Sequence, residues 1–341
     1  MRPDPSFLTL HRPTFNHTGV IVVNLIRILA MLSLLTCGYV HAQSYPGRPV
    51  RVVVPYSAGG SGDVVARTIG AKLTEAWGQQ IVIDNRPGAG GNIGTELVAR
   101  APADGYTLLL GTDIQMAINP HIFRKLPFDP DKDFAPVVQG AFIEFVLSVN
   151  PSIPAGNLPE LVAYLKTQPG KHSYASSGMG STHHLSMEWL KHVAGIDVVH
   201  VPYKGSGQTL PDLISGQVQL AYTGIAQTMP HVKSGKLKAI AIGAARRIAA
   251  VPGVATIAET YPGVETNGSW NYFAPAGTPR EIVMKINAEV NRILASPEVR
   301  ERFVSQGLFP IGGTPEQLAA RMKSDFDKWG AVVRTIGLKA E

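Results

Sequence analysis

The sequence predicts an α/β protein of two lobes, each lobe a parallel-rich sheet flanked by helices. Apolar segments of strand length alternate with amphipathic segments of helical spacing from Pro49 onward. The alternation occurs in two sets, and the C-terminal part is typical of helices. The chain has 341 residues, enough for two ordinary domains, since ~100–200 residues is usual for one.

The first set starts with an apolar run, Val50 to Val54, of the buried-strand type. The next segment carries Val64, Val65, Ile69 and Leu73 at helical spacing. In order, this set comprises strand 50–54, helix 63–76, strand 81–83, helix 92–100, strand 106–110 and an extended region over 134–149.

The second set repeats the same alternation with shorter segments. It comprises helix 158–167, strand 173–175, helix 181–194, strand 198–201, helix 209–215 and strands 219–223 and 237–242. Because strands joined through a helix run parallel, both sets predict parallel sheets covered by helices.

Two threonines are expected to cap helices in the C-terminal part. Thr278-Pro279-Arg280-Glu281 and Thr314-Pro315-Glu316-Gln317 each place a Thr before a first-turn Pro, with Glu or Gln at the third helical position. We expect the chain to cross between lobes near 143–149 and to return near 268–276. Lobe 1 then comprises residues 43–146 and 270–341, and lobe 2 comprises 147–269.

The N-terminal 42 residues are typical of a secretory signal. Arg27 precedes an apolar stretch, 28–40, which ends in Val40-His41-Ala42, a signal-peptidase pattern. Two alternatives are a retained membrane anchor over 20–40, which would contain Arg27, and a lipidated Cys37. Cys37 is the only cysteine, so the mature chain has no disulfide.

Composition and motifs argue against several classes of protein. The net charge is +6, and no basic run exceeds the pair Arg246-Arg247, which disfavours nucleic-acid binding. No G-x-S-x-G, H-E-x-x-H or P-loop pattern occurs. His183, His184 and His192 are expected to cap or pack, and the FDPDKD segment to form a solvated acidic turn. We therefore expect no catalytic residues, metal or cofactor.

The turn after the first strand is a candidate anion site. Gly59, Gly60 and Gly62 follow that strand, and a helix begins at about Asp63. The first N–H groups of a helix are unpaired and carry partial positive charge, so a carboxylate or phosphate can dock there. The alternative is that the Asp63 carboxylate occupies these donors itself.

A second turn of this kind, Ser173 to Leu185, adds hydroxyl groups to the backbone donors. Two such turns facing each other would suit a solute with a negative group at each end, such as a dicarboxylate. The alternative is two ordinary capped turns. The glycine-rich segment 86–94 is not a dinucleotide fingerprint, because Ile93 stands where the pattern needs glycine. Its glycines are expected to allow close backbone approach.

Six segments give the chain a family resemblance. They are YPGRPVRVVVPYSAGGSGDVVAR from Tyr45, NRPGAGGNIG from Asn85, APADGYTLLLGT from Ala101, YASSGMGSTHHL from Tyr174, HVPYKGSG from His200 and FAPAGTP from Phe273. The chain resembles the Bug-type substrate-binding receptors of tripartite tricarboxylate transporters. The resemblance implies a type II periplasmic-binding-protein fold, a Venus flytrap that closes on a small organic anion. It also implies a membrane permease of one large and one small subunit as partner.

The resemblance also implies a set of ligand-binding residues. They are Ala58, Gly59 and Gly60 at one carboxylate with Tyr56 and Asp63 beside it, Ser177, Gly178, Gly180 and Ser181 on the opposite wall, and Thr112, Tyr203 and Gly205 lining the cleft. Thr223 is a further candidate wall residue, because it lies at the carboxyl end of a predicted strand, where ligands contact α/β sheets. Many members have an aspartate in the stretch 216–224, where this chain has Gln219 and Thr223, so we expect a di-, tri- or aromatic carboxylate without an amine.

These features predict a periplasmic receptor, a monomer without enzymatic activity. One alternative is an exported enzyme on the same frame, with His184 and Asp63 as acid and base. Another is a receptor that signals to a sensor kinase.

Overall fold

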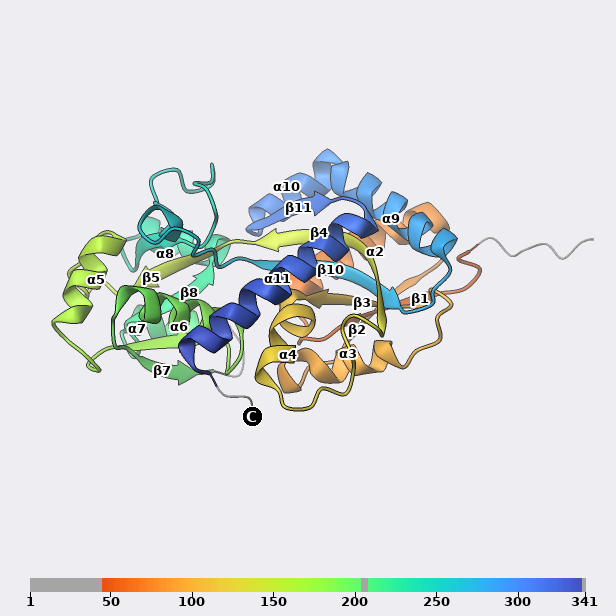
Figure 1. Cartoon of the computed structure of the whole chain (residues 1–341). Coiled ribbons are helices and arrows are strands. Elements are labelled where there is room, and N and C mark those ends of the chain that lie inside the picture. Colours follow the sequence, from red (N-terminus) through yellow and green to blue (C-terminus); the bar gives the residue numbers. More distant parts are fainter. Residues whose placement is uncertain (1–44, 204–207, 339–341) are drawn as a thin grey trace, which may run out of the picture. The chain divides into compact units, whose positions relative to one another are not determined.

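Two mixed sheets with helices on their faces make up the fold of the computed structural model (Figure 1), which describes residues 45–203 and 208–338. The signal sequence 1–42, its two alternatives and Gly205 lie outside the described residues. The elements are β1 (Val50–Val54), α2 (Ser61–Trp77), β2 (Ile81–Asn85), η1 (Ala89–Gly91), α3 (Asn92–Ala99), β3 (Thr107–Thr112), η2 (Ile114–Ile118), α4 (Asn119–Ile122), β4 (Phe134–Ile143), β5 (Phe145–Val149), α5 (Leu158–Lys166), β6 (Ser173–Ser176), α6 (Thr182–Ala194), β7 (Val199–Pro202), α7 (Thr209–Ser215), β8 (Leu220–Gly224), α8 (Ile225–Lys233), β9 (Lys238–Ile242), η3 (Ile257–Glu259), β10 (Gly268–Pro275), α9 (Arg280–Ala295), α10 (Pro297–Ser305), β11 (Leu308–Gly312) and α11 (Pro315–Ile336).

The first sheet has the strand order β11-β4-β10-β3-β1-β2. β1 pairs in parallel with β2 and β3, as strands joined through α2 and α3 should. β10 is antiparallel to β3 and β4, and β11 is antiparallel to β4. The sheet is therefore mixed. The parallel arrangement expected from the sequence holds for β1, β2 and β3, whereas the pairings of β10 and β11 are antiparallel, because no crossover helix connects these strands to a parallel neighbour.

The second sheet has the order β7-β6-β8-β5-β9. β6 pairs in parallel with β7 and β8, whereas β5 is antiparallel to β8 and β9. β5 enters this sheet directly from β4. Its direction is thus set by the chain crossing from the other sheet rather than by a strand–helix–strand unit.

The crossing between the sheets takes place at Glu144, between β4 and β5. The extended region expected over 134–149 is thus two strands in different sheets. Gly243, after β9, donates its N–H to Phe145 O (3.0 Å), and Thr266 donates its N–H to Gly243 O (2.8 Å). The outgoing and returning segments consequently lie side by side. A Cβ at Gly243 would collide with Thr266 O, which explains the glycine.

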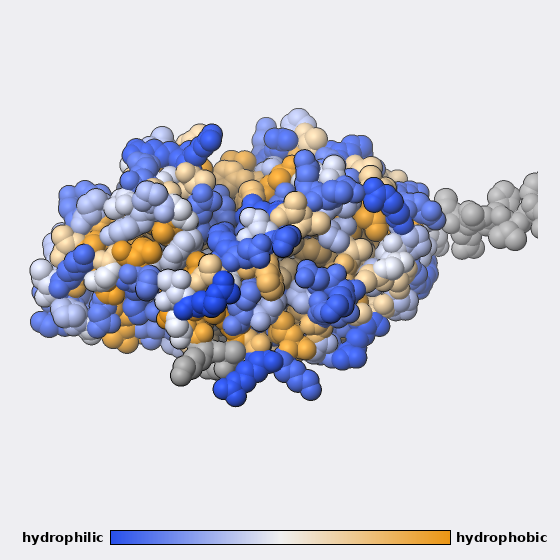
Figure 2. All heavy atoms as spheres, viewed as in Figure 1, coloured by the Kyte–Doolittle hydropathy of each residue, from blue (hydrophilic) through white to orange (hydrophobic). Residues whose placement is uncertain are grey.

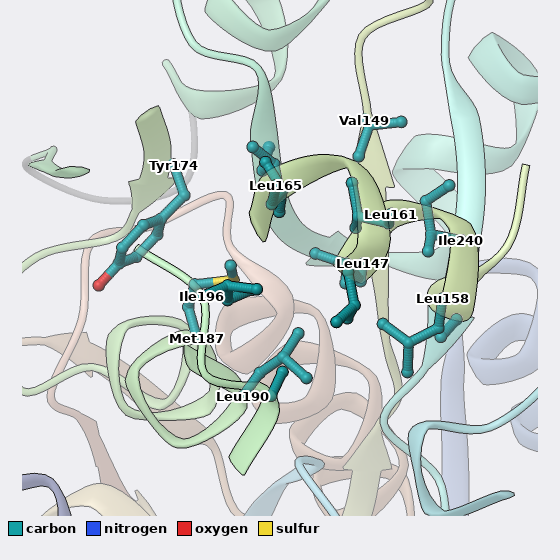
Figure 3. Packing of buried hydrophobic residues seen from close by; sticks show 14 of the residues in the cluster. Leu147, Val149, Leu158, Leu161, Leu165, Tyr174, Met187, Leu190, Ile196 and Ile240 are labelled. Atoms are coloured by element: carbon teal, nitrogen blue, oxygen red, sulfur yellow. The ribbon is translucent and has the colours of Figure 1, made fainter. Parts of the chain in front are cut away.

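Each sheet has its own apolar core, and a further cluster joins elements of both. Around the second sheet, leucines of β5 and α5 pack against Tyr174, Met187 and Leu190 (Figure 3). The joining cluster combines Leu185 of α6 with residues of η2, α4 and α11. Trp189 and Trp329 extend it, with ring centroids 6.1 Å apart. α11 therefore packs on elements of both sheets.

The two expected threonine caps differ in outcome. Thr314 caps α11 as predicted: Gln317 N–H donates to Thr314 Oγ1 (3.2 Å), and Thr314 N–H donates to Gln317 Oε1 (2.8 Å). The capping prediction for Thr278 is wrong, because α9 begins at Arg280 after Pro279. Thr278 thus lies one residue before the N-cap position, and its hydroxyl donates to Pro275 O (2.7 Å), a carbonyl at the end of β10.

Within the described residues, no helix has the length and apolar character needed to cross a membrane. The large exposed hydrophobic side chains are Val82, Ile93, Met179, Val193, Val199, Met284 and Val304. On the face shown in Figure 2, hydrophobic residues form small patches between hydrophilic ones.

Candidate functional site

The turn between β1 and α2 exposes the start of a long helix. Gly60 is the N-cap of α2, and no side chain caps this position. Ala58, Gly59 and Gly60 are exposed, and Gly59 has a φ of +86°, which favours glycine. Backbone N–H groups at the start of α2 are therefore available to an anion.

Asp63 braces this turn from within α2. Its Oδ2 accepts from Gly59 N–H (3.2 Å) and from Arg67 Nε (2.8 Å), while its buried Oδ1 has no partner among the described residues. Burial raises the pKa of Asp63, but these hydrogen bonds outweigh burial and hold it below its usual value. The sequence left open that the Asp63 carboxylate itself accepts from the backbone N–H groups of this turn. It does so for one of them, the N–H of Gly59.

Trp270, on β10, seals the inner side of the same turn. Its ring lies edge-on to Tyr56, with centroids 5.5 Å apart, and its Nε1 donates to Ser61 Oγ (3.2 Å). A Cβ at Gly62 would collide with this ring, so the glycine is needed for the contact. The sequence indicated Trp270 only as part of a returning strand.

Gln115, in η2, connects three segments and was missed from the sequence. It is fully buried, and its Oε1 accepts from the backbone N–H (2.9 Å) and the hydroxyl (3.0 Å) of Thr112. Its Nε2 donates to Tyr56 OH (2.8 Å) and to Gly90 O (2.9 Å). Burial raises the pKa of Tyr56 to about 12. The sequence indicates this residue in one way: Gln115 is the polar residue in the apolar segment IQMAI.

The segment 86–94 uses its glycines for close approach, as expected. A Cβ at Gly91 would collide with the Gln115 amide, and one at Gly94 would lie 2.8 Å from Arg86 O.

The second turn, between β6 and α6, is capped by its own serine. Ser181 Oγ accepts from His184 N–H (3.3 Å) and donates to Gly178 O (2.7 Å). Gly178 and Gly180 have φ values of +126° and +72°. The start of α6 is therefore less open than that of α2, and the Ser181 hydroxyl already has two partners.

Histidines brace the second turn. The contacts are His183 Nδ1 with Ser177 Oγ (2.8 Å), His184 Nδ1 accepting from Gly180 N–H (3.2 Å), and His200 Nε2 with Ser176 Oγ (2.7 Å). Burial lowers the pKa of all three side chains, to about 4 for His183 and His200. The packing role expected for His184 is confirmed. Because its Nδ1 is bonded and Asp63 is paired with Arg67, this structure does not favour their use as acid and base.

Tyr203 contacts the second turn through its backbone. Its N–H donates to Ser176 O (3.0 Å), and its carbonyl oxygen lies 3.2 Å from the position of a Cβ at Gly178. The hydroxyl points elsewhere and donates to Asp212 Oδ2 (2.6 Å); burial, followed by Asp212, raises the pKa of Tyr203 to about 12. Thr223 is buried and accepts from Thr228 Oγ1 (2.6 Å).

The predicted site residues form two groups: Gly180 of the second lies next to α4, and the first is linked to α4 through Gln115 and Gly90, which were not predicted as site residues. Gly90, bonded to Gln115, lies near Asn119, whereas a Cβ at Gly180 would collide with Ile122. Among the residues that the structure describes, no hydrogen bond joins the first turn directly to the second.

A hollow of about 590 Å³ near Phe123, Arg124 and Phe326 contains none of the predicted site residues. No metal-binding group of His, Cys, Asp or Glu occurs within residues 45–203 and 208–338.

Similar proteins identify the family. The chain is 35% identical to Protein BugT of Bordetella pertussis, over 93% of this chain and 99% of BugT. The solved structure of R. palustris Rpa4515 with adipate is 37% identical, with a TM-score of 0.81 over 87% of this chain and 100% of its own. MatC from Rhodopseudomonas palustris with bound malate is 35% identical, with a TM-score of 0.76 over 85% of this chain and 100% of its own.

Residues 65–338 match the TctC family, described as the tripartite tricarboxylate transporter family receptor. This match confirms the resemblance seen in the sequence motifs, and the similar solved structures confirm the two-lobed α/β fold expected from it. The family is one of solute-binding receptors, which agrees with the expectation of a protein without enzymatic activity. The chain belongs to the TctC family of tripartite tricarboxylate transporter receptors.

Proposed function

We propose that this protein is a periplasmic receptor that binds a small organic carboxylate between two lobes and delivers it to a tripartite tricarboxylate-type permease. Family membership supports the receptor role. The Rpa4515 structure contains adipate and the MatC structure contains malate, both of them dicarboxylates. These similarities favour a carboxylate over other small anions.

The observation that carries the proposal is the uncapped, exposed start of α2. Backbone N–H groups there, next to exposed Ala58, Gly59 and Gly60, suit a carboxylate without an arginine. Ser177 and Gly178 of the second turn would hold the other end of the solute. Six of the remaining expected residues support these two turns: Tyr56, Asp63, Thr112, Gly180, Ser181 and Tyr203. Thr223 would line the cleft beside them.

The lobes of this proposal follow the two sheets to within two residues at each boundary. Lobe 1 would comprise residues 43–146 and 270–341, and lobe 2 residues 147–269, with rotation about the crossing at Glu144 and the returning segment before β10. Gln219 lies in the stretch 216–224, where many members have an aspartate, and its Oε1 accepts from Ser173 N–H (3.0 Å). Because this side chain serves the fold, we propose a solute without an amine.

The test is a thermal-shift screen of mature protein with carboxylates including malate, succinate, adipate and citrate. A ligand at a hundredfold excess over its Kd stabilises the fold by about 2.7 kcal/mol. Gly59→Val should abolish this stabilisation, because the side chain covers the start of α2. The matched control is Gly263→Val: both glycines are exposed with nothing within 4 Å of a Cβ, and their φ values are +86° and +85°.

Both variants should lose similar intrinsic stability, since the backbone strain is the same. Equal ligand-induced stabilisation in the Gly59 variant and the control would contradict the site. Consumption of a stabilising carboxylate by the protein would contradict the receptor role itself.

A further inference from the structure

Ser177 and His183 form a hydrogen-bonded pair on the second turn. Ser177 Oγ and His183 Nδ1 are 2.8 Å apart. The other ring nitrogen, Nε2, is buried and has no hydrogen-bond partner among the described residues. A buried polar atom without a partner destabilises the folded state, so its retention calls for an explanation.

The pair lies between the second turn and the crossing segments. The His183 ring packs edge-on against Phe145 of β5, with centroids 4.5 Å apart. The Phe145 ring in turn lies 3.3 Å from the position of a Cβ at Gly268, where β10 begins. An apolar ring on this side cannot satisfy Nε2. The imidazole thus stands where elements of the two sheets meet, next to a serine that we propose contacts the solute.

Ser177 and His183 together carry two polar hydrogens on their side chains. Burial lowers the pKa of His183 to about 4, so the imidazole is neutral at pH 7 and carries one N–H. Ser177 carries one O–H. One of these two hydrogens is used in the bond between the residues, whichever residue donates it. The pair therefore presents one donor and one acceptor to its surroundings.

We propose that His183 is a specificity-determining residue that contacts the solute through Nε2, and that the pair selects a carboxylate bearing a neighbouring hydroxyl group. A carboxylate oxygen accepts the donor of the pair, and the solute hydroxyl donates to its acceptor. The corresponding carboxylate without the hydroxyl offers only acceptors, so it leaves the acceptor of the pair unmatched. This inference rests on the proposed function, whose substrate class it narrows.

The test uses titration calorimetry at pH 7.5 with solutes that differ by one hydroxyl: malate and succinate, 2-hydroxyadipate and adipate, mandelate and phenylacetate. We expect the protein to bind the hydroxylated member of its best pair about tenfold more tightly, the effect of one hydrogen bond. His183→Asn places an amide near the Nδ1 position, keeps the bond to Ser177 and removes Nε2. This variant should bind both members within about twofold of each other.

Three further variants make the test specific. His183→Gln places its amide near the Nε2 position and should keep the preference. Ser177→Ala leaves His183 as a single polar side chain that cannot donate and accept at once through Nε2, so the preference should fall to about twofold. His192→Asn, an exposed histidine on the same helix, should behave like the unaltered protein.

The results distinguish a failure of the proposed function from a failure of this inference alone. If the unaltered protein binds no carboxylate, the proposed function fails and the inference fails with it. If it binds carboxylates without preferring the hydroxylated member, the inference alone is overturned. The same holds if His183→Asn or Ser177→Ala retains the full preference. A preference lost in these two variants and kept in His183→Gln and His192→Asn supports it.

Discussion

Gln115 shows how a single buried amide can organise a binding turn. Its four hydrogen bonds reach Thr112, Tyr56 and Gly90, which belong to three separate segments. The side chain lies in η2, away from the glycine turns that drew attention in the sequence. The segment IQMAI shows that Gln115 is a polar residue among apolar ones, but not which groups it binds, because its partners are up to 59 positions away along the chain.

Gln115→Leu should destabilise the protein by about 2–4 kcal/mol, because the buried Thr112 N–H loses its acceptor and the Thr112 and Tyr56 hydroxyls each lose one partner. It should also weaken carboxylate binding, because Tyr56 loses its support. Urea unfolding and the thermal-shift assay measure the two effects. Gln306→Leu, at an exposed position after α10, is the matched control and should change stability by no more than about 0.5 kcal/mol. Equal stabilities for both variants would contradict the bracing role.

At the scale of the helix, two similar threonine motifs behave differently. Both Thr278 and Thr314 precede a proline, yet only Thr314 forms a capping box. In the first motif the helix begins one residue later, so Pro279 and not Thr278 stands at the N-cap of α9. The Thr278 hydroxyl donates to the strand carbonyl of Pro275.

Thr314→Ala should lower the free energy of unfolding by about 1 kcal/mol, the usual value of an N-cap hydroxyl. Thr314→Ser should recover most of this loss, because a serine oxygen can accept from Gln317 N–H in the same way. Chemical denaturation followed by circular dichroism measures both. An alanine variant as stable as the serine variant would show that the hydroxyl contributes nothing to α11.

At the scale of the whole molecule, the crossing contains buried carboxyl groups. Glu144 is 7% exposed, and its Oε2 has no partner among the described residues. Burial raises the pKa of Glu144 to about 7, although a hydrogen bond with Asn267 and the charge of Arg321 act against the rise. Nearby, Asp113 Oδ1 accepts from Ser269 N–H (3.1 Å), and burial followed by the charge of Asp325 raises its pKa to about 6.

This burial predicts a pH dependence of stability. Unfolded glutamate loses its proton near pH 4.5, whereas Glu144 in the fold keeps its proton until about pH 7. The folded state binds more protons in this window, so the contribution of Glu144 to stability is lost as the pH rises through it. The Glu144→Gln variant has no proton to lose at this position. Its free energy of unfolding should therefore rise relative to that of the unaltered protein as the pH increases, by up to about 3 kcal/mol at pH 8.

Urea unfolding at several pH values between 4.5 and 8 measures the difference in the free energy of unfolding between this variant and the unaltered protein. Glu281→Gln, an exposed glutamate on α9, controls for the change in net charge. The buried histidines act in the opposite direction, because their lowered pKa values make stability fall as the pH drops from about 6.5 toward 4. The difference between the Glu144 variant and the unaltered protein isolates the glutamate. A constant gap across this range would contradict the raised pKa.

The order of strands, glycine turns and helices along the chain was sufficient to predict the α/β class, the family and the turn at Gly59 and Gly60. These features depend on short-range properties: side-chain periodicity, the freedom of glycine and the unpaired N–H groups of a helix start. Strand direction in β10, the support from Gln115 and Trp270, and the bracing of Ser177 by His183 emerged only in the folded chain. They depend on which distant segments become neighbours, and packing determines this after the local elements have formed.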